Sequence, residues 1–422
     1  MDISIRAICG GLGVAALVAA CSANGGGNVF TSSDGDTGGA GHGGSATGTK
    51  STGTGAGDVG GGDISFTTSG TGTGTGNTCN HAPDADGDGD GWTANEGDCN
   101  DCDPNVNPGA IEVVATDPNA PPADENCDGM IDNVEPTCDD GLALDDVNPL
   151  NGARAVDLCK IAEETPASKK DKTWGVIGAQ YVRANGTAYA APGYQVGLQA
   201  GWGPNVHPQG GTKMLAISSG RARLPGQTGE CGDNSCPNNS PGQAPPGFPQ
   251  DVAGCDGSTV IKDDVALQVK IRTPTNATGY SFAFNFYSFE YPEFVCTLFN
   301  DQFISLVDPA PNGSVSGNIS FDSNHNPVSV NVAFFNVCDP CPLGTAQLAG
   351  TGFDGAWYDD GGATGWLKSQ APVKGGDVIT IRWTIWDTGD QSWDSTALVD
   401  NFQWIANGGT VSVGTDPINM PK

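Results

Sequence analysis

The stretch Tyr280-Ser281-Phe282-Ala283-Phe284-Asn285-Phe286-Tyr287 alternates in strand fashion, so Phe282, Phe284 and Phe286 share one face. Further strand-like runs lie at 266–271, 302–307, 328–334, 379–385 and 397–405. A short helix is expected over 153–162. Because the strands are short and separated by loops rich in Gly, Pro, Asn and Asp, they predict a mostly β chain folded as an antiparallel β-sandwich of jelly-roll-like topology.

The composition changes sharply along the 422 residues. Gly, Ser and Thr dominate before residue 79 and can bury no core, which is typical of a disordered tether. The next segment is acidic and rich in turn residues, so we expect disulfides and bound metal to hold it together. The predicted segments are a lipoprotein signal peptide (1–20), the tether (21–78), an acidic metal-binding module (79–135), a β-sandwich domain (136–409) and a C-terminal tail (410–422).

The N-terminus predicts export and lipid anchoring. Residues 7–20 are apolar or small and are too short to span a bilayer. The run Leu17-Val18-Ala19-Ala20-Cys21 is similar to a bacterial lipobox, in which Cys21 would carry the lipid. The alternative is an ordinary signal peptide followed by an unmodified cysteine. Because Ser22 stands where an Asp would suggest inner-membrane retention, we expect an outer-membrane lipoprotein exposed at the cell surface, on the extracellular or periplasmic face.

Cysteine usage also indicates an exported protein. Twelve of the 14 cysteines remain once the one inside the signal peptide and Cys21 are set aside. An even number in a secreted chain predicts up to six disulfides, whose pairing the sequence leaves open. Cys99 with Cys102, and Cys338 with Cys341, have the spacing of zinc or redox motifs. Acidic neighbours and the lack of a nearby His favour disulfides instead.

The charge of the chain restricts its partners. The net charge is −31 and the pI is about 4.1. Nucleic acid and anionic lipid surfaces would repel such a chain, so neither is expected as a partner.

Residues 79–135 hold fifteen Asp and Glu and no Lys or Arg. A segment of like charge repels itself and gains no core, so we expect it to bind a hard divalent cation, namely calcium.

The segment 124–135 fits a twelve-residue calcium loop, with oxygen donors at positions 1, 3, 5, 9 and 12 and Gly129 at position 6. Met130 would supply its backbone carbonyl at position 7. No clear helices flank the loop, so a paired EF-hand is not expected, and the alternative is a solvated acidic loop. The predicted ligands are Asp124, Asn126, Asp128, Met130, Asp132 and Glu135.

An earlier run, residues 84–92, repeats Asp at every second position. Aligning Gly91 to position 6 makes Trp92 the carbonyl donor but places Gly97, which has no side-chain oxygen, at position 12. A carboxylate from the following turn, Asp98, Asp101 or Asp103, would have to complete the shell. The predicted ligands are Asp86, Asp88, Asp90, Trp92, Asp98 and Asp101.

Together the two acidic runs resemble a metal-binding motif found in bacterial surface proteins. The matching segments are 86–92, 97–101, 103–112 and 125–132. The sequence departs from the motif by inserting Cys102 and the segment 113–123. The resemblance implies a disulfide between Cys99 and Cys127.

Aromatic and acidic residues are interspersed in three segments of the large domain, 284–295, 299–303 and 383–402. These segments resemble the choice-of-anchor L domain, and the resemblance covers roughly 137–407. It implies a bacterial surface or extracellular β-domain that occurs with varied anchoring signals, and it implies no biochemical activity. Lipid at Cys21 would be the anchor of this chain.

Acidic residues at the strand ends of this domain could hold a second structural calcium. They could equally be turn residues, because Asp favours turns. The candidate ligands are Glu290, Glu293, Asp301, Asp387, Asp390, Asp394 and Asp400.

Signals for catalysis are weak. The four His residues fall in no metal or nucleophile motif, and neither Gly-x-Ser-x-Gly nor His-Glu-x-x-His occurs. Glu290 and Glu293 could act as glycosidase carboxylates. Some tryptophans could stack on sugars, although aromatics at alternating positions normally pack inward: Trp357, Trp366, Trp386 and Trp393.

We therefore expect a calcium-binding, lipid-anchored surface protein, not an enzyme, with an adhesion role toward a cell-surface glycan or protein. The alternative is a carbohydrate-binding or carbohydrate-active secreted protein. A role in acquiring transition metals is not favoured, because the acidic module offers almost no His, Met or thiolate ligands.

Overall fold

The structure is a computed structural model that describes residues 81–114, 122–133, 135–332, 334–357, 360–406 and 409–418. The predicted signal peptide, the lipid site at Cys21 and the tether lie outside the described residues. Within the described ranges, no helix has the length and apolar character needed to cross a membrane.

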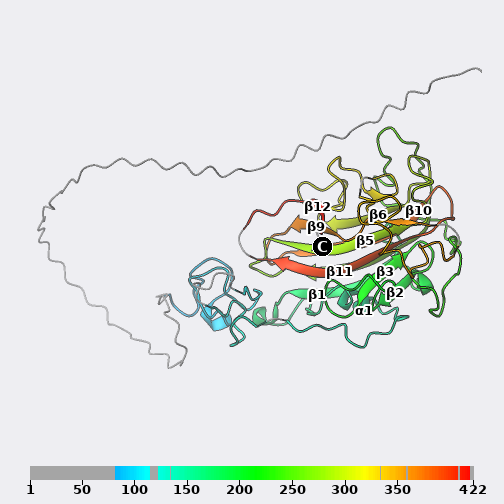
Figure 1. Ribbon diagram of the computed structural model, residues 1–422. Coiled ribbons are helices and arrows are strands. Elements are labelled where there is room, and N and C mark those ends of the chain that lie inside the picture. The colour runs from blue at the N-terminus through cyan, green and yellow to red at the C-terminus, as the bar shows by residue number, and fades with distance from the viewer. Residues whose placement is uncertain are drawn as a thin grey trace, which may run out of the picture. The chain divides into compact units, whose positions relative to one another are not determined.

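Two antiparallel sheets form the predicted β-sandwich (Figure 1). Sheet A contains, in spatial order, β1 (Gly175–Val182), β4 (Ile261–Arg272), β10 (Val378–Thr388), β6 (Gln302–Asp308) and β7 (Val328–Ser329). Sheet B contains β12 (Gly414–Pro417), β9 (Leu367–Pro372), β5 (Gly279–Ser288), β11 (Ser395–Ile405), β3 (Met214–Ser218) and β2 (Val196–Gln199), with β8 (Gly362–Ala363) paired to β5. The chain alternates between the sheets from β4 to β6 and from β9 to β11, which brings the ends of these strands together.

Strand β5 lies at the centre of the core, as the alternating aromatics predict. All ten of its residues are buried. Phe282 packs against Trp383 of β10 and Phe284 against Phe303 of β6, with ring centroids 5.5 Å and 4.9 Å apart. These contacts join the inner faces of the two sheets. Tyr287 belongs to a second apolar cluster on the other side of β5, so this strand is covered on both faces.

The helix predicted over 153–162 is wrong in position. Helix α1 spans Pro149–Arg154 and begins earlier because the Asn148 side chain accepts a hydrogen bond from the backbone N–H of Leu150, with Pro149 at the first helical position. Asp157 has a φ of 69°, which ends any helical continuation. Within the described ranges there are also three short 3₁₀ helices: η1 (Ala94–Glu96), η2 (Lys169–Asp171) and η3 (Gly193–Gln195).

The strand predicted over 328–334 is shorter in the structure, where β7 ends at Ser329. The backbone N–H of Val332 donates to the carbonyl of Ser329 at 3.2 Å, which closes a turn. The backbone N–H of Asn331 donates to the Asn300 side chain at 3.0 Å. Contacts with a distant loop therefore override the local alternation.

The described cysteines are disulfide-bonded, as expected of an exported chain. Cys102 also forms a disulfide. The bridge between Cys99 and Cys127 that the resemblance implies is present. The five pairs within the described residues are Cys99–Cys127, Cys138–Cys159, Cys231–Cys236, Cys255–Cys296 and Cys338–Cys341.

The acidic module is joined to the sandwich by neutral hydrogen bonds and by an ion pair between Glu96 and Lys169. The Asn276 side chain accepts from the backbone N–H of Ile111 at 3.0 Å and donates to its carbonyl at 2.9 Å. Trp174 Nε1 donates to the carbonyl of Ala110 at 3.0 Å. Residues 110–111 are thereby fixed against the sandwich, directly before Glu112, an acidic residue of the module.

Candidate metal centre

The first acidic loop is curled by hydrogen bonds between its aspartates and the backbone. Asp86 accepts from the N–H groups of Gly89 and Gly91 at 2.7 Å and 3.0 Å. Asp88 accepts from the N–H of Asp90 at 3.1 Å. Gly89 and Gly91 have φ values of 84° and 92°, which favour glycine and allow the tight curl. The alternate spacing of the aspartates thus turns their side chains inward.

Carboxylates converge in this loop as the sequence predicts. Two groups place oxygens within 4.8 Å of one another: Asp86, Asp88 and Asp90, and Asp88, Asp98 and Asp101. Asp88 Oδ2 and Asp98 Oδ2 are buried and have no hydrogen-bond partner. Such unpaired buried oxygens are costly unless something neutralises them. These groups could therefore hold a metal ion.

Burial changes the acidity of this cluster. Burial, with smaller effects from the neighbouring Asp90, Asp88 and Asp101 carboxylates, raises the pKa of Asp98 to about 6. Burial also raises the pKa of Asp90 above its ordinary value. A bound cation would lower these pKa values, because it favours the charged form of each carboxylate.

Cation affinity is therefore expected to depend on pH. Carboxylates must be deprotonated to bind a metal, so calcium affinity should fall as the pH falls through about 6, where Asp98 becomes protonated. Competition by one proton predicts affinity roughly tenfold weaker at pH 5 than at pH 7. Calorimetric calcium titrations at the two pH values measure this. Asp98→Asn should flatten the dependence, and equal affinities of the unmodified chain at pH 5 and pH 7 would contradict the assignment.

The second acidic loop, like the first, is curled by hydrogen bonds between its side chains and its own backbone. Asp124 accepts from the N–H groups of Asp128 and Gly129 at 3.1 Å and 2.9 Å. Asp128 accepts from the Met130 N–H at 2.8 Å, and Asn126 accepts from the Asp128 N–H at 2.9 Å. These oxygens hold the turn, and they are not among the groups of converging carboxylates.

A third group of converging carboxylates contains Asp132 together with Glu112 and Glu125. Sequence analysis predicted Asp132 but neither glutamate. Glu112 accepts from the Asn126 N–H at 3.0 Å, and its other oxygen is buried without a partner, as is one oxygen of Asp132. Glu135, predicted as a bidentate ligand, lies instead 3.5 Å from Lys160. The disulfide between Cys99 and Cys127 ties the two acidic loops together.

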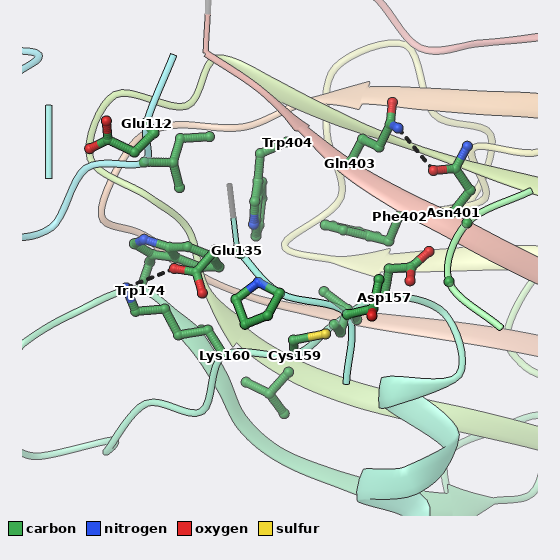
Figure 2. A pocket seen from close by; sticks show the side chains of 18 of the residues that line it. Glu112, Glu135, Asp157, Cys159, Lys160, Trp174, Asn401, Phe402, Gln403 and Trp404 are labelled. Atoms are coloured by element: carbon green, nitrogen blue, oxygen red, sulfur yellow. Dashed lines mark hydrogen bonds and ion pairs between the residues drawn. The ribbon is translucent and has the colours of Figure 1, made fainter. Parts of the chain in front are cut away.

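A pocket of about 500 Å³ adjoins this third group, and both the module and the sandwich line it (Figure 2). The Trp174 and Trp404 rings lie 6.4 Å apart and nearly perpendicular. The Lys160 ammonium lies 4.6 Å from the centre of the Trp174 ring. Asp157 and Glu112 also line the pocket, each with a carboxylate oxygen that has no hydrogen-bond partner. Burial, with a smaller effect from a neighbouring aspartate, raises the pKa of Asp157 to about 6.

The acidic residues predicted for the sandwich do not lie together as one set. Four are buried at the ends of neighbouring strands: Glu290, Asp301, Asp387 and Asp394. Asp390 is half-buried close to them, and Glu293 is exposed. Asp400 lies six residues beyond Asp394 along β11, about 20 Å away at the rise of a strand, so it is not part of this cluster.

The fold and disulfides define a disulfide-rich, mostly β protein of the exported kind. Residues 216–401 match the family model of the choice-of-anchor L domain. The match begins in β3 and ends in β11, and it covers less than half of the chain. The predicted resemblance is confirmed over this part, which includes neither the acidic module nor Cys21. No curated protein matches the chain.

Proposed function

We propose that this protein is a calcium-dependent adhesion protein of the bacterial surface, held at the outer membrane by lipid on Cys21. Calcium orders the acidic module, and the pocket between the module and the sandwich binds a glycan without chemical turnover. The lipobox-like run and the tether support the anchoring part of the proposal, because together they would display the folded part away from a membrane.

The proposal depends on Glu112, which lies both in a possible metal site and in the wall of the pocket. This residue belongs to a group of carboxylates that could hold a metal ion, and it also lines the pocket. Asn126, whose N–H donates to Glu112, lines the same pocket. A cation bound to Glu112, Glu125 and Asp132 would therefore fix one wall of the pocket.

The ligand atoms favour calcium over other metals. All three groups of converging side chains consist of carboxylates, and none includes a His or Cys among the residues that the structure describes. Hard oxygen ligands suit calcium and magnesium, whereas zinc and copper prefer nitrogen and sulfur. Calcium tolerates irregular loop geometry better than magnesium, which demands a near-ideal octahedron. Extracellular calcium modules bind with Kd values of about 10⁻⁴–10⁻³ M, so surrounding calcium could control the pocket.

The pocket combines features that suit a sugar. Its volume of about 500 Å³ lies in the usual range for small-ligand sites. Trp174, Phe402 and Trp404 supply apolar walls, while Asp157 and Lys160 supply hydrogen-bonding groups around the opening (Figure 2). Sugar rings present apolar faces and a rim of hydroxyls, which matches this arrangement of groups.

Glycan binding is expected to need both calcium and the pocket. On a glycan array, the full chain should give signals in millimolar calcium that fall at least tenfold in EDTA. Glu135→Gln and Trp404→Ala should weaken the same signals, because both residues line the pocket. Tyr194→Ala is the matched control, since Tyr194 is a 40 % exposed aromatic residue outside the pocket.

Three results would contradict the proposal. An array without any signal would exclude glycan recognition, and binding to a protein of the cell surface would then be the remaining form of adhesion. Glycan signals that persist unchanged in EDTA would show that glycan binding in the pocket does not depend on the metal centre. Turnover of a bound glycan would show an enzyme in place of an adhesin.

A further inference from the structure

Four buried carboxylates meet at one end of the sandwich, outside the acidic module. Glu290 follows β5, Asp301 precedes β6, Asp387 lies near the end of β10 and Asp394 precedes β11. Strands β5 and β11 are hydrogen-bonded neighbours in sheet B, and β6 and β10 are neighbours in sheet A. Both sheets thus contribute two acids to the same region.

These carboxylates are almost completely removed from solvent. The exposed fractions are 1 % for Glu290, 0 % for Asp301 and Asp387 and 4 % for Asp394. Burying an ionised carboxylate costs several kcal/mol unless it is paired or hydrogen-bonded. Among the described residues, no Lys, Arg or His forms an ion pair with any of the four.

Neutral donors satisfy some of the oxygens. Asp301 accepts from the Thr388 N–H at 2.8 Å and from the Ser395 hydroxyl at 2.7 Å. One oxygen of Asp394 accepts from the Cys236 N–H at 2.8 Å. These bonds leave the negative charge in place, so they do not remove the repulsion among the carboxylates.

The remaining oxygens lack any partner. Both carboxylate oxygens of Asp387 and one of Asp394 are buried without a hydrogen bond. Arg221 and Asp394 line a cavity of about 10 Å³. That guanidinium donates to the carbonyl of Gly229 and forms no ion pair with Asp394. Arg221 therefore does not neutralise the cluster, and Lys262, which pairs with Asp387 in the register of β4 and β10, forms no ion pair with it.

Protonation alone does not account for this arrangement. Burial raises the pKa of Glu290, Asp387 and Asp394 well above the ordinary range and that of Asp301 to about 7, with neighbouring carboxylates adding to the effect. A protonated Asp387 could donate only to a neighbour such as the Asp301 carboxylate, which would leave the charges of the other carboxylates uncompensated. With its carboxyl ionised, neither oxygen of Asp387 has a hydrogen bond. A cation would satisfy both of its oxygens and compensate the charge of its neighbours.

We propose that Asp387, with Asp301 and Asp394, holds a calcium ion inside the sandwich, independently of the acidic module. The carboxylate of Glu290 adds a further negative charge close to the ion. The three groups with oxygens within 4.8 Å of one another all lie in the module part of the described chain. Binding in the sandwich therefore requires side-chain rotation, and Asp387 is held by no hydrogen bond that would oppose it. Calcium accepts such flexible oxygen shells.

The ion would join the two sheets at this end of the sandwich. Asp301 and Asp387 belong to the sheet A side, whereas Asp394 directly precedes β11 of sheet B. Binding to the folded state alone stabilises that state by mass action. Calcium would thus act here as a structural link within the domain.

The number of calcium ions bound by the full chain tests this proposal. Equilibrium dialysis against radioactive calcium compares the unmodified chain with Asp88→Asn/Asp132→Asn, which removes a ligand from each of the three carboxylate groups of the module. We expect the doubly substituted chain to retain one bound ion. Adding Asp387→Asn should remove that ion, whereas adding Glu293→Gln, an exposed neighbour of the site, should leave it bound.

The outcomes separate this proposal from the proposed function. If the chain with the disabled module binds no ion, or if Asp387→Asn leaves the ion count of a folded chain unchanged, the sandwich site is excluded. Failure of Asp387→Asn to fold does not affect the first comparison, which leaves the sandwich residues intact. Failure of the module sites would appear separately, as an ion count that Asp88→Asn/Asp132→Asn does not change.

Discussion

Removing calcium is expected to lower the melting temperature of the full chain by roughly 3–10 °C. The module has little apolar core, and its carboxylates converge with buried, unpaired oxygens on Asp88, Asp98, Glu112 and Asp132. With Kd values of about 10⁻⁴–10⁻³ M, 10 mM calcium would stabilise the folded state by about 1.4–2.7 kcal/mol per site. Thermal unfolding followed by circular dichroism in 10 mM calcium and in EDTA measures the shift.

The shift has a matched control. Asp88→Asn/Asp132→Asn should reduce the difference between the two melts, because Asp88 belongs to the first two carboxylate groups of the module and Asp132 to the third. Asp140→Asn replaces an exposed aspartate outside the groups and should leave the difference unchanged. Identical melts of the unmodified chain with and without calcium would contradict calcium binding.

Removing the disulfide between Cys99 and Cys127 should have the second large effect. This bridge closes a loop with a sequence separation of 28 residues, so its loss is expected to cost about 3–4 kcal/mol of folding free energy. It also ties together the two acidic loops that hold the carboxylate groups. We therefore expect Cys99→Ser/Cys127→Ser to lower stability and to weaken the calcium response together.

Chemical denaturation with and without calcium measures both effects. Cys338→Ser/Cys341→Ser is the comparison, because that bridge has a sequence separation of only 3 and lies outside the module. Its loss should cost about 1.5–2 kcal/mol and leave the calcium response intact. A full calcium response in the chain without the Cys99–Cys127 bridge would show that the bridge does not organise the metal centre.

The sequence predicts best what local periodicity determines. Strand β5 is recognised because Phe282, Phe284 and Phe286 alternate, and the aspartates of residues 86–90 converge because the loop curls through its own backbone N–H groups. Both features depend on residues a few positions apart. The choice-of-anchor L resemblance likewise rests on contiguous segments, and it is confirmed over 216–401.

Contacts between distant residues explain what the sequence could not provide. Glu112 joins Asp132 across 20 positions, and only the folded path of the chain brings them together. Glu135 fits a calcium loop in spacing, yet Lys160 lies 3.5 Å away and competes for it. A hint of the glutamates was present, since Glu112 and Glu125 both fall inside the segments that resemble the metal-binding motif.

Burial also distinguishes acidic residues that look alike in the sequence, because it too depends on contacts between distant residues. Glu290 and Glu293 are three positions apart and read alike in the sequence, but Glu290 is 1 % exposed while Glu293 faces solvent. Asp387 differs most from what its residue type suggests. Asp is typical of turns, yet Asp387 lies in strand β10 of sheet A, and both of its carboxylate oxygens are buried without a hydrogen bond. Buried acidic residues without a hydrogen-bond partner are therefore candidate functional residues that only the structure can identify.

Calorimetric titration of calcium into the full chain at pH 7.5 tests the central claim most directly. We predict saturable heats with Kd values near 10⁻⁴–10⁻³ M, and we predict that Asp88→Asn/Asp132→Asn removes most of them while Asp140→Asn does not. A titration of the unmodified, folded chain that shows no saturable heat up to roughly tenfold above that Kd range would contradict the calcium-ordered module.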